Sequence, residues 1–172
     1  TWVGNVVPTS GNDVIIDHAV TLDVSATPSN ITINSTGGLT LNSNSYTLTT
    51  TTLNNYGSLN TTSGMSSSLL QLLTITNYNG QSGSTFTSGG NAYPVWITNF
   101  HIYNGGTYNH DATGSSSVGS ASDFPGITTI TLDATSNVVI TKWANGGTPV
   151  ALPTQSYGNL TINFTGMAAT WS

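Results

Sequence analysis

Short runs in which aliphatic residues alternate with Thr or Asn recur along most of this 172-residue chain. Alternation with a period of two places successive side chains on opposite faces of a strand, so each run predicts a half-buried β-strand. Gly, Asn and Pro separate the runs and predict turns. The predicted strands are 14–16, 20–24, 31–33, 39–41, 46–49 and 58–60, followed by 95–97, 101–103, 128–132, 138–141 and 160–164.

Signals for α-helix are nearly absent. The chain contains no Glu, and its apolar residues do not recur at the three- and four-residue spacing of an amphipathic helix. The stretch Ser67–Ile75, with its Leu-Leu-Gln-Leu-Leu run, offers the one helical alternative. Two stretches rich in Gly and Ser, 80–91 and 112–126, predict loops.

Internal similarity indicates a repeating architecture. Asn30–Gly37 matches Asn159–Gly166 at all positions except two, and Tyr56–Asn60 matches Gly106–Asn109 more weakly. Short strands, polar corners and repetition together predict an all-β fold of the β-solenoid type, in which coils stack on one another. A β-sandwich predicts similar strands and is the alternative. The corners more often carry Asn-Ser, Thr-Gly-Gly or a lone Asn than hairpin-type pairs, which favours parallel coils.

Composition narrows the environment and the partners. Charged residues make up 4% of the chain, and Lys142 is the one cation against six Asp, so the net charge is −5. Nucleic acid and anionic membrane surfaces are therefore poor partners, and no apolar run is long enough for membrane insertion. The absence of Cys excludes disulfides and thiolate metal sites. A neutral polar surface with so few protease sites suits an extracellular protein.

One domain over 1–172 accounts for this length. No signal peptide is visible at Thr1, so we expect a processed chain or an excised domain.

Four segments resemble the Thr/Asn/Gly-rich secreted repeat proteins of the Bacteroidota cell surface: Val7–Ile16, Val20–Asp23, Leu39–Asn42 and Tyr157–Ile162. The resemblance covers the beginning and the end of the chain and leaves the middle unassigned. It implies a right-handed β-helix or related stack, a bacterial extracellular or cell-surface location, and a role in adhesion or fibre building. It implies no catalytic residues and no cofactor. Such proteins are usually far longer, which would make this chain a fragment or a subunit that gains length by assembly.

Acidic residues near the beginning form a weak candidate metal site. Asp13, Asp17, His18 and Asp23 could offer oxygen and nitrogen ligands to a divalent cation. Asp residues after strands more often cap turns, and the spacing fits no calcium-binding loop. We therefore expect no metal.

Catalysis is also not expected. His101, His110 and Asp111 could contribute to a triad, but Ser is so abundant that the match means little. An enzyme of the β-helix lyase type would need basic residues to handle an acidic sugar, and this chain has one Lys and no Arg.

Several residues are candidates for carbohydrate chemistry. Trp143 is the best placed of four Trp to stack on a sugar ring, although a Trp in such a fold more often fills the core. Sequons, which are candidate glycosylation sites, begin at Asn30, Asn34, Asn60, Asn159 and Asn163. The Thr-rich run 47–52 resembles the faces of ice-binding solenoids, but no Thr-x-Thr ladder repeats at a fixed coil length.

The two ends of the chain are strand-like and carry little protection against pairing. Residues 1–7, before Pro8, form a candidate assembly strand that would pair with another copy by β-augmentation. We expect a structural subunit or repeat module of an extracellular fibre or cell-surface adhesin, assembling head to tail as a homopolymer. A monomeric carbohydrate-binding module is the alternative, and an ice-binding solenoid is the third. The candidate assembly residues are Trp2, Val3, Val6, Val7, Thr170 and Trp171.

Overall fold

The protein is an all-β solenoid. The computed structural model describes residues 6–43, 45–61, 72–90, 95–112, 126–141 and 155–163, in which every regular element is a strand. The strands are β1 (Asp13–Ile16), β2 (Ala19–Thr21), β3 (Asn30–Ile33), β4 (Gly38–Leu41), β5 (Leu48–Asn55), β6 (Ser58–Thr61), β7 (Leu73–Gly80), β8 (Thr85–Gly90), β9 (Val95–Ile102), β10 (Thr107–Ala112), β11 (Gly126–Leu132), β12 (Asn137–Ile140) and β13 (Asn159–Ile162).

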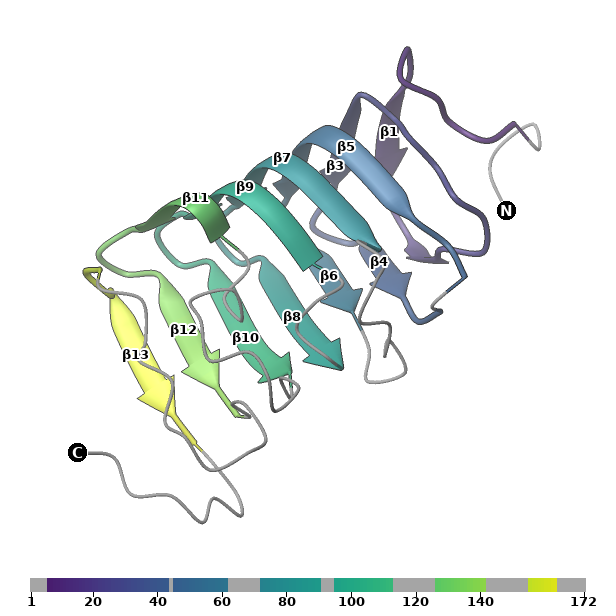
Figure 1. The fold of residues 1–172 in the computed structure, drawn as a ribbon. Coiled ribbons are helices and arrows are strands. Elements are labelled where there is room, and N and C mark those ends of the chain that lie inside the picture. The colour runs from purple at the N-terminus through teal and green to yellow at the C-terminus, as the bar shows by residue number, and fades with distance from the viewer. Residues whose placement is uncertain are drawn as a thin grey trace.

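Successive strands alternate between two parallel sheets (Figure 1). Sheet A has the order β1-β3-β5-β7-β9-β11, and sheet B has the order β13-β12-β10-β8-β6-β4-β2. One strand from each sheet makes a coil, so β1 and β2 form coil 1, and β11 and β12 form coil 6. β13 adds the sheet B strand of a further coil. The parallel ladders confirm the solenoid and overturn the β-sandwich alternative, whose sheets are antiparallel.

The coils differ in length. Hydrogen-bonded side chains in neighbouring coils lie 17 residues apart at Asp13 and Asn30, 22 apart at Asn77 and Asn99, and 25 apart at Asn54 and Asn79. The extra residues lie in the connections, because the strands keep their pairing register. This variation explains why the sequence shows echoes and no fixed period.

Inward residues of the two sheets form one continuous core. In β3, β4, β6 and β12 half-buried and fully buried residues alternate, as the sequence pattern predicts. Coils 4 and 5 hold an aromatic layer in which ring centroids of neighbours are 5.2 to 6.2 Å apart. Its members are Tyr78, Phe86, Phe100 and Tyr108, all exposed by 1% or less.

The corner before sheet B accepts only small residues. A Cβ on Gly57 would lie 2.2 Å from the carbonyl oxygen of Gly37, and a Cβ on Gly106 would lie 2.8 Å from that of Gly80. No side chain fits where backbones of neighbouring coils approach so closely. Gly57 and Gly106 occupy the same corner in coils 3 and 5, which explains why Tyr56–Asn60 resembles Gly106–Asn109.

The stronger sequence echo does not mark equivalent positions. Asn30–Ile33 forms β3 of sheet A, whereas Asn159–Ile162 forms β13 of sheet B. The same alternation suits an inward-facing strand in either sheet, so the pattern predicts a strand without specifying its sheet.

Two further predictions are corrected. Leu73–Ile75 belongs to β7, so the helical alternative is wrong there, while 67–71 lies outside the described residues. β8 lies within 80–91, which we predicted to be a loop. Ser88 of β8 is buried, and it pairs in register with the buried Thr61 and His110 of the neighbouring coils. Most of the second predicted loop, 113–125, lies outside the described residues.

Candidate functional site

Polar and aromatic side chains gather at the corner where the strands of sheet A end. The first residue after each strand donates its backbone N–H to the coil before it: Tyr56 N lies 2.8 Å from Ile33 O, and Tyr103 N lies 2.8 Å from Gly80 O. The same bond recurs from coil to coil, so these residues stand one strand spacing apart. We call them the corner column, and they are Asp17, Asn34, Tyr56, Gln81, Tyr103 and Asp133.

The N-terminal part of the corner column lines a shallow, open surface groove of about 430 Å³. Asn34 Nδ2 donates to Asp17 Oδ1, and Thr36 Oγ1 donates to the backbone oxygen of Asp17 at 2.9 Å. Tyr56 forms the other side of the groove with 45% of its surface exposed. The groove therefore places one open aromatic ring beside a carboxylate and an amide that hold each other in position.

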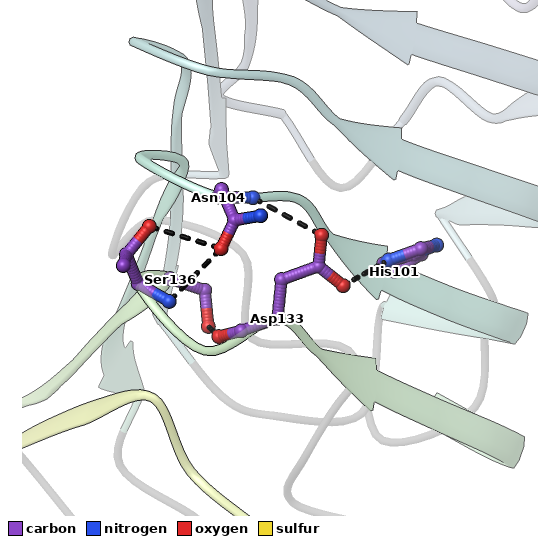
Figure 2. Close-up of polar contacts among 5 residues, drawn as sticks. His101, Asn104, Asp133 and Ser136 are labelled. Atoms are coloured by element: carbon purple, nitrogen blue, oxygen red, sulfur yellow. Dashed lines mark hydrogen bonds and ion pairs between the residues drawn. The ribbon is translucent and has the colours of Figure 1, made fainter.

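At the C-terminal part of the corner column, hydrogen bonds join the side chains of coils 5 and 6 (Figure 2). We call this network the clasp, and its residues are His101, Asn104, Asp133 and Thr135. Asp133 Oδ1 lies 2.8 Å from His101 Nε2, and Asp133 Oδ2 accepts a bond of 3.2 Å from Asn104 N. In return, Asn104 Oδ1 accepts bonds from the backbone N–H and hydroxyl of Thr135 at 3.0 and 2.9 Å. Because Asp133 and Asn104 each accept two bonds from the other coil, the clasp fixes the register of the two turns.

His101 also stacks on a member of the corner column. Its ring centroid is 3.8 Å from that of Tyr103, with the planes 22° apart. Since Asp133 holds the imidazole on its Nε2 side, the stack also restrains the Tyr103 ring.

The candidate metal ligands are not brought together as a site. Asp13 Oδ1 accepts from Asn30 Nδ2 at 2.7 Å, Asp17 accepts from Asn34, and Asp23 is exposed on its own turn. Within the described ranges, no three His, Asp or Glu side chains are arranged to hold a metal ion. The first two carboxylates thus pair with Asn residues of the next coil.

The proposed members of a triad point in different directions. His101 lies on the outer side of sheet A, whereas His110 is buried in the core from β10, and its Nδ1 lies 2.8 Å from the Tyr108 hydroxyl. Asp111 Oδ1 accepts a bond of 2.7 Å from Thr141 Oγ1. Burial lowers the pKa of His110 to about 4, and the neighbouring Asp111 carboxylate opposes the shift.

The Thr-rich run lies along one strand. Thr49 and Thr51 are exposed on β5, while Thr50 is buried and donates to Ser29 O at 3.0 Å. The outward neighbours of Thr49 in the next coils are Thr74 and then Trp96, so the hydroxyl column is interrupted. The column of Thr49 therefore does not carry Thr in every coil, whereas the same register aligns Thr51 with Thr76 and Thr98.

The sequon residues differ in availability. The Nδ2 groups of Asn30 and Asn34 already donate to Asp13 and Asp17, and Asn159 Nδ2 donates to Asn137 Oδ1 at 3.2 Å. Asn60 is half-buried, and Asn163 is exposed.

Among the described residues, β13 is the last strand of sheet B, and its inward side chains are partly exposed. Leu160 and Ile162 of β13 pair in register with Val138 and Ile140, which are fully buried. Yet Leu160 is 37% exposed and Ile162 is 44% exposed.

Only two of the candidate assembly residues are described. Val6 is exposed, whereas Val7 packs against the core beside the buried Pro8. The others, Trp2, Val3, Thr170 and Trp171, lie outside the described residues, as does Trp143.

Comparison with known proteins finds no matching family model, no matching curated protein and no matching solved structure. Among the described residues, no helix is long and apolar enough to cross a membrane.

The sequence analysis missed the corner column and the exposure of Trp96. The column's members differ in type, and their alignment depends on coil lengths that the sequence does not display. A detectable signal was the polar or aromatic residue that directly follows each inward-facing aliphatic strand, as in Ile16-Asp17, Ile33-Asn34 and Ile102-Tyr103.

Proposed function

We propose that this chain is a structural module of a bacterial extracellular fibre or cell-surface adhesin, and that its copies stack head to tail. The open inward side of β13 carries the proposal. Leu160 and Ile162 stand in core columns whose previous members are fully buried, so a further strand on this edge would cover them. Burying such side chains stabilises an assembly by roughly 25 cal/mol per Å² of apolar surface.

The opposite edge of sheet B has a matching pattern. Residues that pair in register through successive strands of sheet B form columns along the solenoid. The column that begins at Ala19 ends at Asn159, and those that begin at Val20 and Thr21 end at Leu160 and Thr161. Placing β2 of one copy on β13 of the next would continue all three columns. Such an interface joins two different surfaces, and because it continues the stacking direction of the coils, it would extend into a filament instead of closing into a ring.

The β13 edge carries few features that prevent pairing. Its sequence, Asn-Leu-Thr-Ile, contains neither the Lys nor the Pro that natural proteins place on exposed edge strands. The extracellular location is supported by the neutral surface and by the resemblance to secreted repeat proteins, and a homopolymer is the partner proposed.

Filament formation is tested by sedimentation velocity and negative-stain electron microscopy as the protein concentration is raised. We expect the wild type to form linear assemblies, and Ile162→Lys to remain monomeric because a buried unpaired ammonium would be costly. Trp96→Lys is the matched control, since Trp96 is equally exposed, at 43%, but lies on the outer face of β9. A wild type that stays monomeric, or equal loss of assembly in both variants, would contradict the proposal.

A further inference from the structure

The groove beside Tyr56 has the components of a sugar-binding site. We infer that it binds a neutral polysaccharide, with the chain of the ligand lying along the corner column. The groove lies on coils 1 to 3, so its first residue, Asp17, stands beside β2, which is the second surface of the proposed stacking interface. Binding and stacking are therefore tested separately, with binding measured on protein that does not assemble.

Tyr56 provides the stacking surface. The aromatic layer of coils 4 and 5 is exposed by 1% or less, whereas Tyr56 presents 45% of its surface to solvent and lines the shallow groove. Its backbone N–H is tied to Ile33 O at 2.8 Å, so the base of the side chain is fixed. An aromatic ring with an apolar face and a polar tip suits the apolar face and the hydroxyls of a pyranose.

Asp17 and Asn34 provide the directional contacts. One oxygen of Asp17 accepts from Asn34 Nδ2, which leaves the second carboxylate oxygen and Asn34 Oδ1 with no hydrogen-bond partner among the described residues. A carboxylate accepts several hydrogen bonds, and sugar hydroxyls donate them. Ser35 and Thr36 add hydroxyls at the same wall of the groove. The acceptors are thus held in place before a ligand arrives.

Charge selects a neutral ligand. The groove contains a carboxylate, the net charge is −5, and the one Lys or Arg of the chain, Lys142, is far along the sequence. An acidic polysaccharide or a phosphorylated ligand would meet repulsion with no cation in the groove to offset it.

The corner column offers a path for more than one sugar unit. Tyr103 follows Tyr56 after two strand spacings, which is about 10 Å along the solenoid, with Gln81 between them. The stack of Tyr103 on His101, which Asp133 holds, restrains this second ring. A linear polysaccharide chain parallel to the solenoid axis would therefore meet two aromatic residues on the same corner.

The test is affinity electrophoresis in native gels that contain galactomannan, xyloglucan or mixed-linkage β-glucan, with polygalacturonate as the acidic comparison. We expect retardation by at least one neutral polymer and none by polygalacturonate. Tyr56→Ala and Asp17→Ala should each raise the apparent Kd about tenfold or more, equivalent to about 1.4 kcal/mol. Tyr56→Phe should keep binding because the ring is retained, and Tyr103→Ala should weaken it less than Tyr56→Ala.

Trp96→Ala serves as the control. It removes an aromatic residue of similar exposure that lies near the start of β9, whereas the corner column follows the ends of the sheet A strands. Thermal melting of each variant checks the fold, and all gels are run with Ile162→Lys as the background so that self-assembly does not contribute. No retardation by any neutral polymer, retardation that survives Tyr56→Ala, or equal weakening by Trp96→Ala would overturn the inference. Retardation by polygalacturonate alone would also overturn it.

Discussion

Single residues at the corners and in the core determine how closely neighbouring coils approach. Gly57 allows backbone contact between coils 2 and 3, and Asn55 stabilises the same turn from inside. Asn55 is fully buried, but its Nδ2 donates to the Tyr78 hydroxyl and to Thr85 O at 3.0 Å each, and its Oδ1 accepts from Gly57 N. A buried amide satisfied in this way imposes one turn geometry, because any other arrangement leaves it without partners.

Replacing Gly57 with Ala should destabilise the protein. The added Cβ would lie 2.2 Å from Gly37 O and 2.4 Å from Asn34 O, so the coils must move apart. We expect a loss of about 2 kcal/mol or more in the free energy of unfolding, measured by urea denaturation. Gly11→Ala is the control, because nothing lies within 4 Å of its Cβ position. Equal stability of the two variants would show that the corner is not tightly packed.

The buried His110 should make the protein sensitive to mild acid. Its pKa falls from 6.5 to about 4 on folding because burial disfavours the charged form. The unfolded chain therefore binds a proton that the folded chain does not, so stability is full above about pH 6.5 and is lost as the pH falls towards about 4. The loss approaches about 3 kcal/mol. Urea denaturation at several pH values should show it.

A variant comparison separates this effect from that of the carboxylates. His110→Gln should be less stable than the wild type at neutral pH but should lose less stability on acidification. His18→Gln, which changes an exposed histidine outside the core, is the comparison variant. If His110→Gln loses as much stability in acid as the wild type, His110 is not the sensitive group.

At the scale of the elements, the alternation of apolar and polar residues predicted many of the strands. The pairing of the strands could not be predicted from that alternation. β3, β4 and β6 were recognisable because aliphatic and small or polar residues alternate, and β1 and β12 because each is a short run of β-branched residues. β8 was missed because three small residues, Ser88, Gly89 and Gly90, end it and are typical of loops. Single members of the corner column could be marked as the polar or aromatic residue after a strand, but their alignment could not be predicted, since they come from coils of unequal length and align through backbone pairing.

The aromatic layer of coils 4 and 5 should contribute more to stability than any exposed aromatic residue. Phe86 contacts Tyr78, Phe100 and Tyr108, with centroids 5.2 to 6.2 Å apart. Phe86→Ala removes a fully buried ring and leaves a cavity, so we expect a loss of about 3 to 5 kcal/mol in thermal or urea denaturation. Tyr56→Ala should change stability by about 0.5 kcal/mol or less. A small effect of Phe86→Ala would mean that the layer is loosely packed.

At the scale of the whole molecule, the solenoid buries its apolar residues by stacking coil on coil, and the described part uses few charges. His101 and Asp133 form the one contact between an Asp and a basic side chain among the described residues, and both side chains are half-buried. Stacking of this kind has no natural limit, because each coil presents to the next the same columns that it received. The self-assembly that we propose would extend the same interactions from one copy to the next.

The most direct test of head-to-tail stacking is site-specific crosslinking between two copies. The wild type contains no Cys, so only the introduced thiols can react. Thr21→Cys and Thr161→Cys proteins are mixed and treated with a short bis-methanethiosulfonate reagent. If β2 of one copy pairs with β13 of another, the two residues adjoin, about 5 Å apart, and a mixed dimer forms as the main product. A yield no higher than that of Thr21→Cys with Thr51→Cys, an exposed position on β5, would contradict head-to-tail stacking.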